Sequence, residues 1–181
     1  DKNIAQFGDE GYDVIVTVGF ALGEATIKNA AKYTKAKFIG VDQFQEKPTA
    51  GVGGLIFPED QAGFQAGVVA AMMSKTGQIG AVLGTDGGPP VWRFGEGYRA
   101  GAWWAKKDTK VNIIYHNDVG FDKTFTDPEW GKTTALSMMD KGADVIFGAG
   151  GKTGNALVEL AEAHLDVAAR PCQVLIFNNS V

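Results

Sequence analysis

The sequence is poor in cysteine and in long apolar runs. Its single cysteine, Cys172, allows no disulfide within the chain, which excludes a disulfide-stapled scaffold without selecting a compartment. No stretch of about 20 consecutive apolar residues occurs, so the sequence predicts no membrane span. The residues that follow Asp1 also contain neither a signal peptide nor a lipid-attachment cysteine.

The chain also has a small net charge and few histidines. The net charge of -4 gives no attraction toward DNA, RNA or anionic lipid, so we expect no nucleic-acid partner. The two histidines, His116 and His164, have no cysteine or second histidine at ligand spacing, which argues against a zinc site. No serine lies in a GxSxG context. The sequence therefore offers no catalytic residue and no metal ligand, and we expect no cofactor.

Apolar strand patterns alternate with amphipathic helical patterns along the chain, which is typical of right-handed βαβ units and predicts an α/β fold with parallel sheets. The expected strands are Asp13–Val18, Lys37–Val41, Gly51–Phe57, Gln78–Leu83, Val111–Tyr115, Ala143–Phe147 and Val174–Phe177. The expected helices are Gly23–Thr34, Gln61–Ser74, Val91–Lys107, Pro128–Met139 and Thr153–His164.

A charged elbow, Pro58-Glu59-Asp60, marks the point where the chain is expected to leave one sheet and begin another. Asp60 is the expected N-cap of the following helix. Glu59 and Asp60 are adjacent in a loop, so we expect capping and hinge hydrogen bonds from them rather than acid–base chemistry. The predicted organisation is a first lobe (1–58), an elbow with a crossover helix (59–77) and a second lobe (78–181).

Three linked motifs then occur in order: FPEDQAGFQAGVVAAMMSKTGQIGAVLG, RFGEGYRAG and FTDPEWGKTTALSMMDKGADVIFGAGGKTGN. Over roughly Asp13 to Glu159 the chain resembles the basic membrane lipoprotein family of substrate-binding proteins, whose characterised members bind purine nucleosides for ABC importers. The resemblance implies a two-lobed type I periplasmic-binding fold that holds its ligand between the lobes and closes about the elbow. It also implies an ABC permease as partner and an extracytoplasmic, membrane-anchored lipoprotein, with the leader and anchor upstream of Asp1.

Both ends of the chain depart from the family pattern, which predicts that the chain is a fragment. The first lobe would lack its opening strands and the ligand-contacting loop among them. Asn178 and Asn179 stand where the family has an Asp-rich turn whose Asp holds the ribose.

In open α/β sheets a ligand binds beyond the carboxyl ends of the strands, and the candidate residues lie there. Phe20 follows a strand and Gly19; it is either a wall of the base pocket or a core residue that closes the sheet. Asp42 ends a Val-rich strand. The resemblance implies that its carboxylate accepts hydrogen bonds from the edge of the purine base. The alternative is a role in a turn or as a helix cap.

The remaining candidates lie in the second lobe. The resemblance implies that Phe125, in its FTDP motif, stacks on the purine, although Phe121 is a rival because residues 116–123 look like an insertion. The resemblance implies that Gly150 and Gly151 lie against the ribose. Glycine suits this position because a residue without Cβ lets the backbone N–H approach a ligand closely.

Two other functions remain open beside the preferred interpretation of a non-enzymatic nucleoside-binding protein. The stretch GAGGKTG imitates a dinucleotide fingerprint, but its spacing is GxGxxxG and no catalytic base or Ser-Tyr-Lys arrangement supports an NAD-dependent oxidoreductase. A cytoplasmic ligand-sensing effector domain of the same fold would need a DNA-binding head before Asp1.

Overall fold

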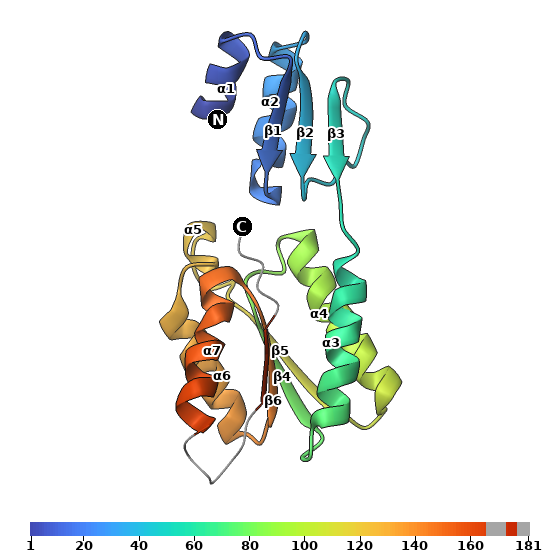
Figure 1. The fold of residues 1–181 in the computed structure, drawn as a ribbon, viewed down its shortest axis with the longest axis vertical. Helices are drawn as coiled ribbons and strands as arrows, with labels where there is room; N and C mark the ends of the chain where they lie inside the picture. Colours follow the sequence, from blue (N-terminus) through green and yellow to red (C-terminus); the bar gives the residue numbers. More distant parts are fainter. Residues whose placement is uncertain (166–172, 177–181) are drawn as a thin grey trace. The chain divides into compact units, whose positions relative to one another are not determined.

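The computed structural model describes residues 1–165 and 173–176, with side chains described through residue 160. The chain divides into two compact units, Asp1–Phe57 and Pro58–Val181, each of which has a parallel sheet of its own (Figure 1). The predicted α/β fold class, with parallel sheets flanked by helices, is confirmed.

The first unit contains a three-stranded parallel sheet of order β1-β2-β3. Its elements are α1 (Lys2–Asp9), β1 (Val14–Val18), η1 (Phe20–Leu22), α2 (Gly23–Lys32), β2 (Lys37–Val41) and β3 (Val52–Leu55). Strand β1 buries every second side chain, so Ile15 packs beside Phe38 of β2 and Ala30 of α2 in the small core of this unit. That alternation fixes which face of the sheet the helices cover.

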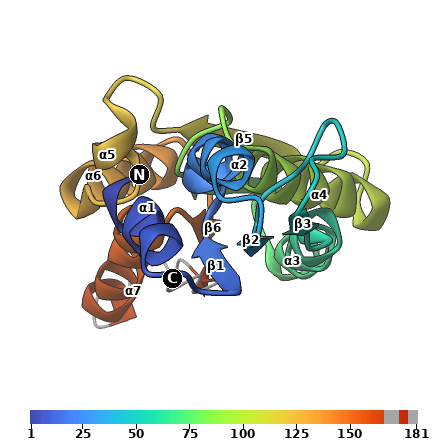
Figure 2. The ribbon, with the colours of Figure 1, turned by 90° about the horizontal axis from the view of Figure 1, so that it is seen from above.

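The second unit contains a four-stranded parallel sheet of order β5-β4-β6-β7. Its elements are α3 (Glu59–Met73), β4 (Gln78–Leu83), α4 (Pro89–Ala105), β5 (Lys110–Tyr115), α5 (Phe121–Thr124), α6 (Pro128–Asp140), β6 (Val145–Ala149), α7 (Gly151–Leu165) and β7 (Gln173–Ile176). Helices α3 and α4 cover one face of the sheet, and α6 and α7 cover the other (Figures 1 and 2). The central strands β4 and β6 are buried on both faces, which explains their continuous apolar runs.

Helices α3 and α4 approach each other so closely that four glycines line their contact. A Cβ at Gly63 or Gly67 would collide with backbone atoms of α4, and a Cβ at Gly97 or Gly101 would collide with backbone atoms of α3. Glycine is therefore required at these helix positions for packing, in spite of its low helix propensity.

The start of α3 corrects one expectation. The helix begins at Glu59 after the N-cap residue Pro58, so Asp60 lies inside the first turn and is not the cap. Glu59 is buried, and its Oε2 lies 3.2 Å from Nη1 of Arg93 on α4. This ion pair ties the first turn of α3 to α4, so the carboxylate of Glu59 joins two helices of the second unit.

The remaining differences lie at short elements and at element ends. Helix α1 and the 3-10 helix η1 were not expected, and α5 occupies part of the segment taken as an insertion. Helix α7 already begins at Gly151, and β6 extends to Ala149. Cys172, Asn178 and Asn179 lie outside the described residues. Among the helices that the structure describes, none has the length and apolar character needed to cross a bilayer.

Candidate functional site

The loops that follow β4, β5 and β6 meet at Gly84. Its N–H donates to the Ala149 carbonyl at 3.2 Å, and its own carbonyl accepts from the His116 N–H at 2.7 Å. A Cβ at Gly150 would lie 2.9 Å from the nitrogen of Gly84. Because only glycine fits at this approach, the glycines that follow β4 and β6 bring the three strand ends together at one edge of the sheet.

Phe125 lies at the same place. A Cβ on Gly84 would collide with its ring, so the ring rests directly on the Gly84 backbone. The ring is half-buried and meets Phe121 edge to face, with centroids 5.8 Å apart. Its carbonyl accepts from the Lys152 N–H at 2.9 Å. The structure thus brings Phe125 together with the Gly150 and Gly151 loop, as the sequence interpretation requires of a shared site.

Gly151 has a φ of 57°, a left-handed conformation that favours glycine. A Cβ there would lie 3.0 Å from the Phe125 carbonyl oxygen. These two constraints explain Gly151 of the GAGGKTG stretch, as the close approach to Gly84 explains Gly150.

The Phe125 loop is anchored by Thr153, which the sequence interpretation did not single out. The fully buried Thr153 hydroxyl donates to the Thr124 carbonyl at 2.9 Å and accepts from the Asp127 N–H at 3.0 Å. Asp127 in turn caps α6 by accepting from the Trp130 N–H at 3.0 Å, as expected for an Asp-Pro helix start. Hydrogen bonds on both sides of Phe125 therefore fix the backbone that presents its ring.

His116 is buried, and it joins this anchor. Its Nδ1 lies 2.7 Å from Oδ1 of Asp118 and its Nε2 lies 3.2 Å from Oδ2 of Asp127. Its ring stacks on the indole of Trp130, with centroids 3.9 Å apart and planes 13° from parallel. The hydrogen bond from the Trp130 N–H, followed by the one from His116, lowers the pKa of Asp127 below its ordinary value.

A second polar chain joins the ends of β4 and β5. The Thr85 hydroxyl donates to Oδ1 of Asn117 at 2.9 Å, and Nδ2 of Asn117 donates to Oδ1 of Asp86 at 2.9 Å. These contacts orient the amide of Asn117. Within the described residues, no group of three or more His, Cys, Asp or Glu side chains is arranged to hold a metal ion.

The first unit places Phe20 and Asp42 after neighbouring parallel strands. Phe20 opens η1 directly after β1, and Asp42 follows β2; both side chains are half-buried. Gln43 joins the two strand ends, because its buried Nε2 donates to the Gly19 carbonyl at 3.0 Å and to Oγ1 of Thr17 at 3.1 Å. Sequence reasoning missed Gln43, since an amide beside a strand end carries no signal of burial.

Asp42 has a φ of 59°, in the left-handed region that Asp and Asn tolerate better than most residues. The backbone alone therefore gives a reason for an Asx residue at this position. A ligand-reading role for its carboxylate stays a prediction beside that conformational one.

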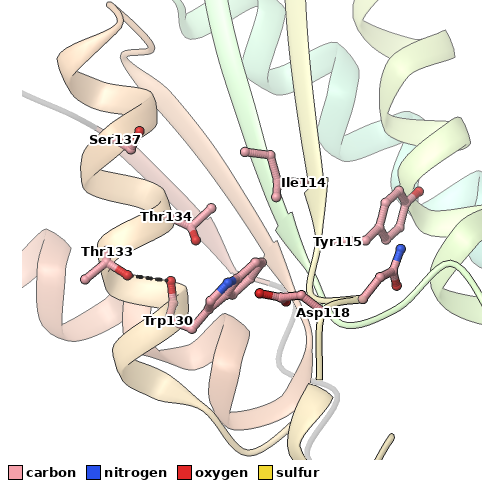
Figure 3. A pocket seen from close by; sticks show the side chains of 8 residues that line it. Ile114, Tyr115, Asp118, Trp130, Thr133, Thr134 and Ser137 are labelled. Atoms are coloured by element: carbon pink, nitrogen blue, oxygen red, sulfur yellow. Dashed lines mark hydrogen bonds between the residues drawn. The ribbon is translucent and has the colours of Figure 1, made fainter. Parts of the chain in front are cut away.

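An open hollow of about 500 Å³ lies between β5 and α6 (Figure 3). None of the five predicted ligand residues lines it. Its lining combines the Trp130 indole with polar side chains from two elements, among them Asn117, Asp118, Thr134 and Ser137.

Comparison with known families and structures gives a consistent result. A family model described as "ABC transporter substrate-binding protein PnrA-like" matches residues 1–165. The ABC transporter nucleoside-binding protein BmpA of Lactococcus lactis subsp. cremoris is 34% identical over 154 residues, which cover 85% of this chain and 42% of that protein. An uncharacterized lipoprotein of Pyrococcus furiosus is 33% identical over 147 residues, covering 78% of this chain and 36% of the lipoprotein.

Among solved structures, an ABC transporter solute-binding protein from Aeropyrum pernix K1 superimposes with a TM-score of 0.74 at 31% identity. The match covers 90% of this chain and 46% of that structure. The chain thus spans less than half the length of each of these three relatives.

Proposed function

The chain belongs to the family of PnrA-like ABC transporter substrate-binding proteins, and on that premise we propose that it serves to capture a purine nucleoside for an ABC importer. The observation that carries the proposal is the position of Phe125. Its ring is held on Gly84, where the loops after β4, β5 and β6 meet, which is the edge where open α/β sheets bind ligands.

In this proposal the base stacks on Phe125. Stacking of a base on an aromatic side chain contributes about 1–3 kcal/mol in nucleic-acid binders, and it needs a ring whose position is fixed in advance. The hydrogen bonds of Thr153 to both flanks of Phe125 meet that requirement. Gly150 and Gly151 complete this part of the site with a loop that carries no side chains.

The strand ends of the first unit supply the second set of proposed contacts. Phe20 is proposed as an apolar wall, and the Asp42 carboxylate as an acceptor for a ring N–H or exocyclic amine of the base. A carboxylate is a suitable group for this role because it offers only acceptors. The hydrogen bonds of Gln43 support the proposal, because they hold the loops after β1 and β2 in a fixed relation.

Binding of this kind makes and breaks no covalent bond, so the proposed activity is capture and release without turnover. The proposed partner is the membrane permease of the importer. The proposed location is extracytoplasmic, as a lipid-anchored protein, and the lipoprotein name of the Pyrococcus relative supports it.

A thermal-shift panel tests the ligand class. A ligand that binds only the folded protein raises its melting temperature by mass action. We expect adenosine, guanosine and inosine to raise the melting temperature more than uridine at equal concentration. A shift with NAD and none with any nucleoside would overturn the proposal in favour of the dinucleotide-binding alternative.

A further inference from the structure

The hollow beside Trp130 has the dimensions of a small-molecule site. Its volume of about 500 Å³ falls within the roughly 300–1,000 Å³ that ligand pockets usually have. Strand β5, at the edge of its sheet, forms one wall and the outer side of α6 forms the other (Figure 3).

The aromatic wall of the hollow is fixed in position. The Trp130 indole stacks on the buried ring of His116, and its backbone N–H is held by the Asp127 cap. His116 is itself bound at both ring nitrogens by Asp118 and Asp127. An indole held in this way is a preorganised flat surface, which a ligand does not have to order on binding.

The polar groups of the lining are mostly uncharged hydroxyls and an amide. Thr134 and Ser137 present hydroxyls from successive turns of α6, and each hydroxyl can both donate and accept. The Thr133 hydroxyl donates to the Glu129 carbonyl at 2.9 Å, which leaves it as an acceptor for a ligand. The amide of Asn117 is oriented by Thr85 and Asp86.

The charges of the lining exclude one class of ligand. Asp118 is the charged residue among the lining side chains, its carboxylate is 71% exposed, and no Lys or Arg lines the hollow. A phosphate or carboxylate ligand would therefore meet repulsion and find no cation. The hydroxyls and amide outnumber the single carboxylate, which favours a neutral ligand rich in hydroxyl groups over a cation.

We infer that this hollow is a second binding site, for an uncharged polyhydroxylated ring of the kind found in sugars. The apolar C–H face of such a ring packs on the Trp130 indole. Its outward hydroxyls exchange hydrogen bonds with Thr134, Ser137, Asn117 and Asp118. The site is separate from the proposed nucleoside contacts at Phe125, which does not line the hollow.

Nuclear magnetic resonance of the isotope-labelled protein tests the site. The indole N–H resonance of Trp130 is assigned with a Trp130→Phe variant, and D-glucose and D-ribose are titrated separately. We expect a saturable shift of the Trp130 resonance with at least one of the two sugars. Trp104, 72% exposed on α4, provides an internal control indole that should not shift.

Two variants test the hydroxyl contacts. Thr134→Val and Ser137→Ala should each weaken sugar binding about three- to tenfold, which is the effect of losing one hydrogen bond. Glucose 6-phosphate should shift the Trp130 resonance less than glucose does. Phe125→Ala should leave sugar binding unchanged, so that failure of the nucleoside proposal and failure of this one are distinguishable.

Three outcomes would overturn the inference. The first is that neither sugar shifts the Trp130 resonance, or that the Trp104 resonance shifts to the same extent. The second is unchanged sugar affinity in both hydroxyl variants. The third is a saturable shift with choline and none with the sugars, which would assign the hollow to a cation.

Discussion

Phe125 is the residue on which the proposed nucleoside contact depends most directly. Its ring rests on Gly84 while the hydrogen bonds of Thr153 hold the backbone on either side of it. The rigidity of the ring is thus a property of residues distant in sequence, and the motif around Phe125 does not reveal it.

Phe125→Ala should weaken purine nucleoside binding by at least about 1 kcal/mol, or roughly fivefold, because the stacking surface is lost. Phe125→Trp should retain most of the affinity, since an indole also stacks. Phe121→Ala is the matched comparison and should have a smaller effect, because Phe121 touches the Phe125 ring only by an edge. Dissociation constants measured by calorimetry test this prediction. Equal losses of nucleoside affinity in the two alanine variants would contradict the assignment of the stacking role to Phe125.

Asp42→Asn isolates the charge of the proposed base-reading residue. Asn accepts the φ of 59° as readily as Asp does, so the backbone should be kept. We expect a larger loss of affinity for guanosine and inosine, which carry a ring N–H, than for adenosine. Loss of affinity to the same degree for all three nucleosides would assign Asp42 a structural role instead.

At the scale of elements, two contacts stabilise the second unit, and each can be tested by measuring the free energy of unfolding of a variant. One is the glycine-lined contact of α3 with α4. The other is the turn after α3, where Asp144 accepts from the Ser74 hydroxyl at 2.6 Å and from the N–H groups of Lys75 and Thr76 at 2.7 and 2.9 Å.

Gly67→Ala should lower the free energy of unfolding by about 1–3 kcal/mol, because the added methyl group collides with the Tyr98 carbonyl. The sign of this change in the free energy of unfolding is informative, since alanine normally stabilises a helix relative to glycine by up to about 1 kcal/mol. Gly23→Ala in α2 is the control; a Cβ there meets nothing closer than 4.0 Å, so that change should be neutral or stabilising. Denaturant unfolding curves for the two variants provide the measurement.

Asp144→Asn should destabilise the protein by about 1 kcal/mol at neutral pH, a figure that allows for solvent screening. Partial burial alone raises the pKa of Asp144, but the Ser74 hydroxyl and the N–H groups of Thr76 and Lys75 together lower it below its ordinary value.

Because the folded-state pKa of Asp144 is lowered, its stabilisation is present above the unfolded pKa and is lost as the pH falls through the folded value. The difference in unfolding free energy between wild type and Asp144→Asn should therefore shrink below about pH 4. Asp140→Asn, which removes an exposed carboxylate at the end of α6, is the matched control and should leave the free energy of unfolding at neutral pH nearly unchanged. A difference that stays constant down to low pH would contradict this account of the turn.

At the scale of the whole molecule, the sequence predicted the alternation of strands and helices well. The bounds of β2 and β4 agree with expectation because each is an apolar run ended by polar or glycine residues. Helix α1 was missed because its eight residues are too few to show a repeated helical period, and they end in Gly8 and Asp9 and bury only Ile4. Helix α5 was missed because its four residues carry no periodic signal.

The candidate site was predictable only in part. Residues at strand ends, such as Phe20 and Asp42, can be located once the strands are found. The contact of Phe125 with Gly84 joins residues about forty positions apart, and the anchoring by Thr153 and His116 depends on side-chain burial. No local sequence pattern indicates these contacts between residues that are distant along the chain.

Calorimetric titration of the purified protein with adenosine, guanosine, inosine and uridine tests whether the protein captures purine nucleosides. We expect saturable binding of at least one purine nucleoside, about micromolar or tighter, with uridine bound more weakly. Absence of binding by every purine nucleoside, or equal affinity for uridine, would contradict it.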